Sequence, residues 1–239
     1  MIAHEPVGPI WLLRFQSGEN RLNDDFLNEF NEVLDRIEGS GWPTAVVTTG
    51  AGKFYSNGLD LDWLHSAPEP EAFMTRVHEL LIRVLTFPAV TVAAVNGHAF
   101  AAGAMLATAH DFVIMRSDRG YWCLPEVDLG LPLTPTMFAL LQSRLSQAAL
   151  HEAVTTGKRY DAQAMLEVQI AHESAPEEVV LSRAVELATE LSGKDHSVVA
   201  RHKQLMYADV IATSERSDSM VTSPNGGGSG HDVGHVVLK

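Results

Sequence analysis

The chain has 239 residues and a formal net charge of -13, from 30 acidic and 17 basic side chains. This length is enough for one large domain to bury its own hydrophobic core without disulfide bonds. The acidic balance argues against broad electrostatic binding to nucleic acid or to an anionic membrane surface. The lone cysteine, Cys123, excludes a disulfide framework and a thiolate metal cage, and it fits a reducing compartment.

The N-terminal stretch MIAHEPVGPIWLLRF has no basic start, no long apolar run and no small-residue cleavage site. A secretory signal would have all three of these features. We therefore expect a cytoplasmic protein.

Strand and helix patterns alternate along the first half of the chain. Apolar runs rich in Val, Ile, Leu and Thr are typical of buried strands, and the segment between the first two runs repeats its apolar residues at helical spacing, with Asn23 or Asp24 as a possible N-cap. Such alternation predicts an α/β fold with parallel strands, whose active site gathers in the loops after the strands. We expect strands at 9–15, 44–49, 89–95 and 111–116 and helices at about 22–38, 70–86 and 100–109.

Residues 89–109 contain no Asp, Glu, Lys or Arg, so they meet the length criterion for a membrane span. Their composition changes, however, from Val and Thr to Ala and Met across Asn96, Gly97 and His98. This change predicts strand, turn and helix, and polar residues at mid-depth would be costly in lipid. We expect no membrane association.

The second half of the chain has a different character. Helical patterns follow Pro135, and the sequence from about 214 is rich in Ser and Gly with few apolar residues. We expect an α/β core at 1–135, a helical lid or oligomerisation region at 136–213 and a flexible tail at 214–239.

Two loops, at 51–61 and 96–106, each follow a predicted strand and carry Gly or Ala where backbone N–H groups can be exposed. Two such loops can aim two N–H donors at one oxygen, and the second lies at a helix N-terminus, whose dipole favours developing negative charge. Small side chains leave room for the ligand. The pattern alone is weak evidence, because Gly-rich turns after strands are common.

Three segments, GKFYSNGLDL, AAVNGHAFAAGAMLATAHDFVIM and LPEVDLGLP, resemble in order and spacing the signature segments of the enoyl-CoA hydratase/isomerase (crotonase) family. The resemblance runs from residue 5 to about 205. It implies a crotonase-like spiral of ββα units with a C-terminal helical region, assembly into homotrimers or hexamers, and an acyl-CoA thioester as substrate. The backbone N–H groups of Leu59 and Ala102 match the positions that hold the thioester oxygen in the family.

The family's hydratases carry two catalytic Glu residues, and at the matching positions this chain has Met105 and Glu126. Hydration benefits from two acid/base groups, whereas moving a double bond needs one. The pattern is therefore similar to the Δ3,Δ2-enoyl-CoA isomerase branch, including plant-type isomerases, which act on unsaturated fatty acids in β-oxidation. Glu126 would be the acid/base, and its apolar neighbours are expected to raise its pKa.

The resemblance also implies contacts with the substrate and no cofactor or metal beyond the coenzyme A of the substrate. Asp60, Asp62 and Asp128 are expected to cap helices or stabilise turns, and Arg21 and Lys53 to be surface charges. The HDVGH segment at 231–235 has metal-like spacing, but its Gly-rich setting favours chance. The predicted substrate contacts are Ser56, Asn57, Gly58, Gly103, Met105 and Leu131.

Several alternatives remain open. Glu126 could be an ordinary loop carboxylate, Met105 simply core, and His98 a contact of the substrate. Another crotonase reaction, such as hydration, thioester hydrolysis or decarboxylation, would be favoured by a polar group from the helical half, for instance Thr134 or Gln142. A non-catalytic acyl-CoA binder is the alternative from another class. Two departures from the family weaken the transfer: Val168 stands where a Gly is common, and a Gly/Ser tail replaces a terminal helix.

Overall fold

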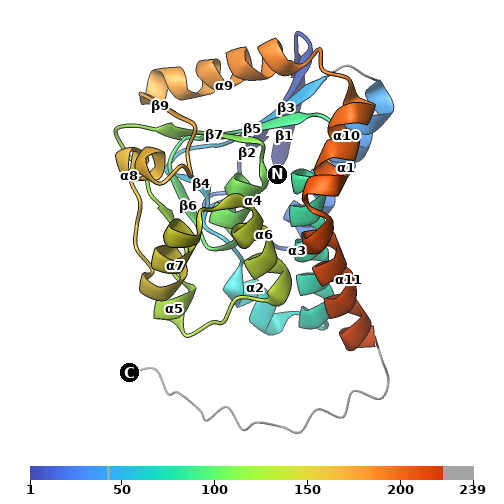
Figure 1. The fold of residues 1–239 in the computed structure, drawn as a ribbon, viewed down its shortest axis with the longest axis vertical. Helices are drawn as coiled ribbons and strands as arrows, with labels where there is room; N and C mark the ends of the chain where they lie inside the picture. Colours follow the sequence, from blue (N-terminus) through green and yellow to red (C-terminus); the bar gives the residue numbers. More distant parts are fainter. Residues whose placement is uncertain (42–43, 223–239) are drawn as a thin grey trace, which may run out of the picture.

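The computed structural model describes residues 1–41 and 44–222 and contains two β-sheets (Figure 1). The larger sheet has the strand order β1-β2-β3-β5-β7-β9, in which β1 is antiparallel to β2 and the other pairs are parallel. The smaller sheet has the order β4-β6-β8 with parallel pairing. The strands are β1 Ile2–Val7, β2 Ile10–Phe15, β3 Ala45–Gly50, β4 Phe54–Ser56, β5 Val90–Val95, β6 His98–Phe100, β7 Phe112–Arg116, β8 Trp122–Cys123 and β9 Glu173–Ala175.

Strands alternate between the two sheets along the chain. β3, β5 and β7 of the large sheet are each followed at once by β4, β6 and β8 of the small one, and a helix comes after each pair. Each ββα unit of the chain therefore adds one strand to the large sheet, one strand to the small sheet and one helix. This is the predicted spiral of ββα units.

Helices cover both faces of the large sheet. α9 packs across one face, at the top of Figure 1, where Val180, Ala184 and Ala188 meet the Val, Ile and Ala side chains of the strands. A larger core on the other face joins the sheet to α1, α3 and α4. The helices are α1 Asp24–Ser40, α2 Leu61–Ser66, α3 Pro70–Leu85, α4 Ala102–Ala109, α5 Glu126–Leu129, α6 Pro135–Arg144, α7 Gln147–Thr156, α8 Ala162–Glu167, α9 Glu177–Leu191, α10 His196–Met206 and α11 Ala208–Thr222.

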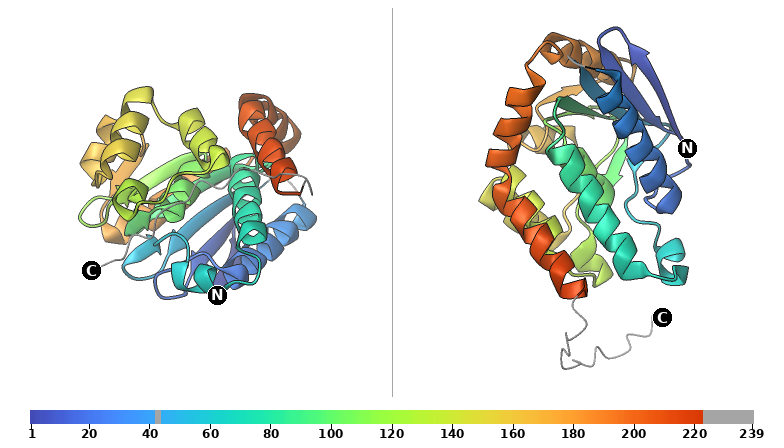
Figure 2. Two further views of the ribbon diagram at one scale, coloured as in Figure 1. Left: turned by 90° about the horizontal axis from the view of Figure 1, so that it is seen from below. Right: turned by 90° about the vertical axis from the view of Figure 1, so that its right-hand side faces the viewer.

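The last two helices run along one side of the molecule, as the right panel of Figure 2 shows. α11 packs against both α3 and α6, so the chain does have a terminal helix on the core. It continues to Thr222, past the boundary at 213 where we expected the tail to begin. The HDVGH segment and the rest of 223–239 lie outside the described residues.

A buried ionic cluster attaches the C-terminal arm, which consists of α10 and α11, to the large sheet. Lys203, on α10, donates from Nζ to Asp111 Oδ2 at 2.6 Å and to the carbonyl oxygens of Phe87 and Ala89 at 2.9 and 2.8 Å. Asp111 also accepts from the N–H and the hydroxyl of Thr91. All three donors of the ammonium group therefore have partners, as a buried charge requires.

The predicted elements of the first half agree with the structure to within two residues; the helix expected at 100–109, for example, begins at Ala102. The sequence analysis missed β1 and the whole small sheet, whose strands have only two or three residues each. Val168, which stands where a Gly is common in the family, has a φ of -97°, and the next residue, Gln169, adopts a positive φ of 61°. Among the described residues, none of the helices combines the length and the apolar character that a membrane span requires.

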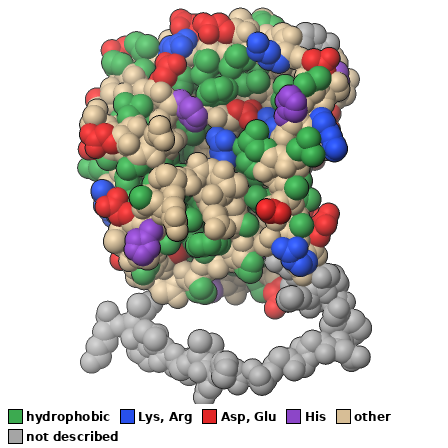
Figure 3. Space-filling view, viewed as in Figure 1, with side chains coloured by type: hydrophobic (Ala, Val, Ile, Leu, Met, Phe, Trp, Pro, Cys, Tyr) green, Lys and Arg blue, Asp and Glu red, His purple; other side chains and the backbone are tan. Residues whose placement is uncertain are grey.

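Charged side chains of both signs are interspersed on the face seen in Figure 3. Many of the basic groups are paired, for example Arg183 with Glu173 and Arg83 with Asp35.

Candidate active site

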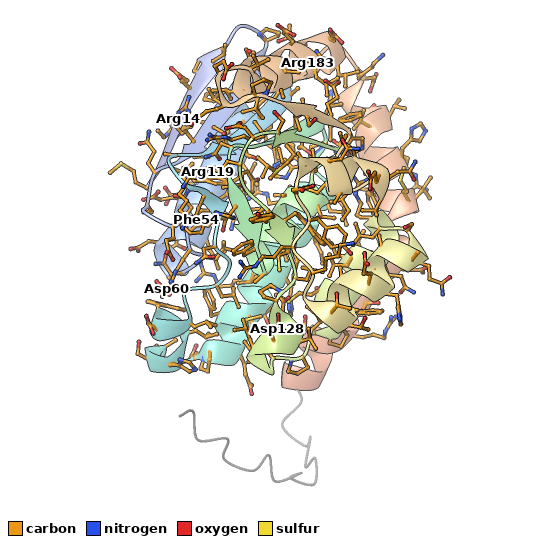
Figure 4. The ribbon with its side chains drawn as sticks, turned by 90° about the vertical axis from the view of Figure 1, so that its left-hand side faces the viewer. Arg14, Phe54, Asp60, Arg119, Asp128 and Arg183 are labelled. Carbon is orange, nitrogen blue, oxygen red and sulfur yellow. The ribbon has the colours of Figure 1, made fainter. Side chains whose placement is uncertain are left out.

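A cavity of about 570 Å³ opens among α2, α3, α5 and α6 and reaches the start of α4. Its wall is mostly apolar, as is typical of small-molecule sites. Asp60, at the start of α2, and Asp128, in α5, lie toward the same end of the molecule, the lower end of Figure 4. The lining residues are Arg21, Asn57, Leu59, Leu61, Leu64, His65, Met74, Phe100, Ala101, Ala102, Met105, Pro125, Glu126, Leu129, Leu131, Pro132, Leu133, Thr134 and Met137.

The Leu59 N–H is left unpaired by the local strand geometry. Leu22 forms a parallel bridge with Leu59. In this bridge the Leu22 N–H donates to the Gly58 carbonyl, and the Leu22 carbonyl accepts from the Asp60 N–H. The Leu59 N–H therefore faces away from Leu22, and within the described residues it donates to no protein acceptor. Gly58 makes this turn possible with a φ of 84°, a conformation that glycine adopts without steric cost.

The Ala102 N–H is exposed by a strained residue. Ala101 has φ 51° and ψ -127°, a combination that side chains with a Cβ rarely adopt, and it precedes the first residue of α4. The free N–H groups of a helix's first turn carry the positive end of its dipole. In the described part of the chain the Ala102 N–H has no protein acceptor, and Ala102 lines the cavity.

The two loops are in direct contact. A Cβ added to Gly58 would lie 2.9 Å from Ala101 Cβ and 3.3 Å from Ala102 N, and one added to Gly103 would lie 2.3 Å from the Ser56 carbonyl oxygen. The two loops can approach this closely only because positions 58 and 103 lack side chains. The structure therefore brings the two loops together at the cavity wall, and a shared role of their N–H groups in holding one oxygen atom stays a prediction.

The predicted substrate contacts divide into two groups. Asn57, Met105 and Leu131 line the cavity, with Leu59, Ala102 and Glu126. Ser56, Gly58 and Gly103 are not among its lining residues: they lie behind the wall and hold the two loops together. The fully buried Ser56 hydroxyl donates to the Asn20 carbonyl at 2.7 Å, which ties the first loop to residue 20.

Glu126 begins the short helix α5 and lines the cavity. Burial raises the pKa of its carboxyl group above the ordinary value, and its own backbone N–H only partly offsets this effect. Its Oε2 atom is buried and has no hydrogen-bond partner among the described residues. Met105, only 1 % exposed, packs in the core and also lines the cavity, so its two expected roles coincide. Glu126 is the one carboxylate among the described lining residues.

The two basic residues expected at the surface, Arg21 and Lys53, lie differently with respect to the cavity. Arg21, expected to be a surface charge, lines the cavity, where Glu19 accepts hydrogen bonds from both Arg21 and Asn57 at 2.8 and 2.9 Å. Lys53 is not a lining residue, and its ammonium group lies 5.2 Å from the Phe54 ring centre.

His98 also lies outside the cavity wall, so the structure does not support its contact with a ligand there. Its ring packs between Phe54, Phe100 and Tyr121, and burial with the nearby cationic groups lowers its pKa. Figure 4 shows Phe54 and Arg119 in this part of the molecule.

The carboxylates expected to have structural roles are placed away from the cavity wall. Asp60 accepts from the Trp63 N–H and caps α2. Asp128 packs against Gly157, where an added Cβ would lie 2.5 Å from its Oδ2 atom. In residues 1–41 and 44–222, no group of His, Cys, Asp and Glu side chains is arranged to hold a metal ion.

Sequence reasoning missed the contribution of α2 and α3, which supply Leu61, Leu64 and Met74 to the wall. Apolar residues at helical spacing indicate only that a helix is half buried, not whether it faces a core or a cavity. Of the two polar residues considered in the helical half, Thr134 lines the cavity and Gln142 is exposed.

The spiral of ββα units and the cavity at the start of α4 define the crotonase class of α/β proteins. The enoyl-CoA hydratase/isomerase family profile matches residues 8–220, so the chain belongs to the enoyl-CoA hydratase/isomerase family. This confirms the resemblance seen in the three sequence segments.

Individual relatives support the same assignment. The chain is 32% identical over 224 residues to the peroxisomal enoyl-CoA delta isomerase 2 of Arabidopsis thaliana, which covers 88% of this chain and 93% of that protein. The crystal structure of an enoyl-CoA hydratase from Mycobacterium marinum superposes with a TM-score of 0.85 at 25% identity, covering 92% and 97% of the two chains. The human mitochondrial delta3-delta2-enoyl-CoA isomerase gives a TM-score of 0.81 at 26% identity, with 92% and 87% covered. These matches confirm the predicted fold.

Proposed function

We propose that this protein is a Δ3,Δ2-enoyl-CoA isomerase that converts a 3-enoyl-CoA to the trans-2-enoyl-CoA, as fatty-acid β-oxidation requires for unsaturated chains. The observation that carries the proposal is Glu126, the one carboxylate among the described residues of the cavity wall, whose buried Oε2 atom has no hydrogen-bond partner within them. A desolvated and unpaired carboxylate is a stronger base than one in water. Relatives described as enoyl-CoA delta isomerases add support.

The reaction starts with the loss of a proton from C2 of the 3-enoyl thioester to Glu126. The electron pair of the broken C–H bond spreads over C2, C4 and the thioester oxygen, so negative charge develops on that oxygen. The N–H groups of Leu59 and Ala102 stabilise it, and one donor of this kind typically contributes about 3 kcal/mol. Glu126 then returns the proton to C4, which leaves the double bond between C2 and C3.

Met105 bears on whether the protein also adds water to its substrate. It occupies the position that carries a second carboxylate in the family's hydratases, and it presents an apolar surface to the cavity. Without that group, position 105 offers no second carboxylate to activate a water molecule. We therefore expect isomerisation without hydration.

Hydration is the second candidate reaction, because a relative of similar fold is described as an enoyl-CoA hydratase. The Thr134 hydroxyl in the wall is the observation that favours it, since it is a polar group from the helical half. No cofactor other than the coenzyme A of the substrate is needed for either reaction. Assembly as a homotrimer or hexamer and a cytosolic location stay predictions.

The test uses the purified full-length chain with a 3-enoyl-CoA and, separately, a 2-enoyl-CoA. Ultraviolet absorbance follows the conjugated thioester, and chromatography detects any 3-hydroxyacyl-CoA. Glu126→Gln is the test variant. Asp128→Asn is its matched control, because Asp128 lies on the same short helix but outside the cavity wall. Conjugation without hydration, lost in E126Q and kept in D128N, would support the proposal.

Hydration by the unmodified protein, or full isomerase activity in E126Q, would contradict the assignment of Glu126 and Met105. Binding of acyl-CoA without either reaction would indicate the non-catalytic acyl-CoA binder.

A further inference from the structure

Thr134 is a polar residue in the cavity wall that the proposed reaction does not use. Three other polar side chains of the wall already have a partner or a role: Arg21 and Asn57 both donate to Glu19, and Glu126 is the proposed base. Thr134 lies at the start of α6, and the apolar residues Leu131, Pro132 and Leu133 come directly before it. Its hydroxyl is therefore an isolated hydrogen-bonding group in an apolar part of the wall.

The hydrogen bonds of this hydroxyl can be counted. A Thr hydroxyl has one donor hydrogen and two acceptor lone pairs. The Met137 N–H donates to Thr134 Oγ1 at 3.3 Å, as expected for an N-cap, and His78 Nε2 lies 2.9 Å from the same oxygen. In the part of the chain that the structure describes, no third partner of the hydroxyl is found. One hydrogen-bonding position of the hydroxyl thus stays available to a bound molecule.

His78 holds this position open whichever ring nitrogen carries its proton. If Nε2–H donates to Thr134, both lone pairs are used, so the hydroxyl hydrogen is free to donate into the cavity. If Nε2 accepts from the hydroxyl, one lone pair is free to accept from the cavity. His78 lies on α3, is 6 % exposed and is not a lining residue, so it supports Thr134 from behind the wall.

Helix capping alone does not explain the pair. Ser146 caps α7 by accepting from the Ala149 N–H, and Asp60 caps α2 by accepting from the Trp63 N–H; among the described residues neither cap side chain is hydrogen-bonded to a histidine. Placing an imidazole in the core has a desolvation cost, which a capping role at Thr134 would not require. In either protonation state of the ring, the bond to His78 leaves one hydrogen-bonding position of the Thr134 hydroxyl for the cavity.

We propose that Thr134, oriented by His78, is a specificity-determining residue that recognises an oxygen on the acyl chain. The preferred substrate class is then an acyl-CoA whose chain carries a hydroxyl or carbonyl group beyond the reacting carbons, rather than an unsubstituted hydrocarbon chain. This inference rests on the proposed acyl-CoA function of the same cavity. In water such an oxygen is fully solvated, so the cavity must replace its hydrogen bond to accept it.

The experiment measures binding rather than turnover, so that it does not depend on which reaction the protein catalyses. Saturated acyl-CoA esters cannot isomerise, and their dissociation constants are measured by calorimetry with the full-length chain. A series of one chain length carries a hydroxyl or keto group at successive carbons beyond C4, with the unsubstituted ester as reference. The variants are Thr134→Val, Thr134→Ser, His78→Phe and the cap control Ser146→Ala.

We expect one member of the series to bind about five-fold more tightly than the unsubstituted ester, the size of one net neutral hydrogen bond. T134V should abolish this ratio, H78F should reduce it, and T134S and S146A should keep it. Because the ratio compares two ligands on one variant, a general loss of stability cancels. A melting curve for each variant confirms that it is folded.

The failure of this inference is distinguishable from the failure of the proposed function. If the unsubstituted ester binds and no oxygenated member binds more tightly, the specificity proposal is wrong and the acyl-CoA function stands. A preference that persists in T134V would place the recognition elsewhere and overturn the role of Thr134. If no acyl-CoA ester binds at all, both proposals fail.

Discussion

Two largely buried carboxylates, Asp111 and Glu126, differ in how fully their oxygen atoms are hydrogen-bonded. Asp111 accepts hydrogen bonds from the Lys203 ammonium group and from the N–H and hydroxyl of Thr91, and its side chain is 19% exposed. Glu126 lies in an apolar cavity wall with one oxygen that has no partner among the described residues. The first carboxylate connects the C-terminal arm to the sheet, and the second faces the space where a ligand would bind.

The difference in hydrogen bonding between Asp111 and Glu126 gives one of them a role in stability and the other a role in the proposed reaction. A buried charge whose hydrogen bonds are all made resists the loss of any partner, because the group left behind would be buried and unpaired. A carboxylate without partners weakens the fold but is a better base. The two groups should therefore respond to mutation in opposite ways, Asp111 through the free energy of unfolding and Glu126 through the reaction rate.

The largest effect is expected for Glu126→Gln on isomerisation. Removing a general acid/base typically lowers the rate 10²- to 10⁴-fold, about 3 to 5 kcal/mol in activation free energy. The measurement is kcat for conversion of a 3-enoyl-CoA, with KM determined in parallel. Since the glutamine keeps the shape of the side chain, KM should change little. A variant that loses its affinity for the substrate instead would show that Glu126 binds rather than reacts.

Lys203→Met is expected to have the next largest effect, on stability. The change leaves Asp111 without its cationic partner, and breaking a buried pair from one side costs about 3 kcal/mol or more. Urea unfolding of the full chain measures it. Lys158→Met is the matched control, because Lys158 pairs with Glu152 on the surface, where such pairs contribute about 1 kcal/mol or less. Equal losses in the two variants would contradict the structural role of the buried cluster.

Thr91→Val should have a smaller effect of the same kind. The Thr91 hydroxyl donates to Asp111 Oδ2 at 3.2 Å and accepts from the Asp111 N–H at 3.0 Å, whereas the Thr91 N–H bond to Asp111 survives the substitution. Losing these bonds at a partly exposed carboxylate should cost about 1 to 2 kcal/mol in the free energy of unfolding. Isomerase activity should be unchanged, which separates this cluster from Glu126.

The sequence alone predicted the parts of the molecule that depend on local pattern. The strands of the large sheet from β2 to β7 and the helix α3 follow from runs of apolar residues, and Asn23 caps α1 as expected. The small sheet was not predictable, because strands of two or three residues carry no period. The extension of α11 to Thr222 was missed because Ser-rich composition suggests a loop, although packing on α3 and α6 stabilises a helix there.

The candidate site shows the same division. The two loops, Glu126 and Met105 could be named from the sequence, because short motifs directly after strands carry them. The strain at Ala101 and the contact of Gly58 with the Ala102 backbone could not, since both depend on how two distant loops meet. For the same reason the pairing of His78 with Thr134, which joins α3 to α6, has no signal in the sequence.

The smallest effect returns to Glu126, now as a gain in stability. Because burial raises the pKa of its carboxyl group in the folded state, the native protein holds this proton more tightly than the unfolded chain does. Stability is then highest below the unfolded pKa, about 4, and falls as the pH rises through the raised pKa. At neutral pH the ionised group opposes folding, so E126Q should be more stable than the unmodified protein by about 1 kcal/mol, or roughly 2 to 4 °C in Tm.

This gain should depend on pH in a way that a simple packing effect would not. The difference in Tm between E126Q and the unmodified protein should shrink as the pH falls below about 4, because Glu126 then becomes protonated in the unfolded chain as well. The control is Asp128→Asn on the same helix, whose carboxylate is not in the cavity wall and which should show no such gain. If E126Q were less stable at neutral pH, Glu126 would have to hold partners like those of Asp111, and the contrast between the two carboxylates would disappear.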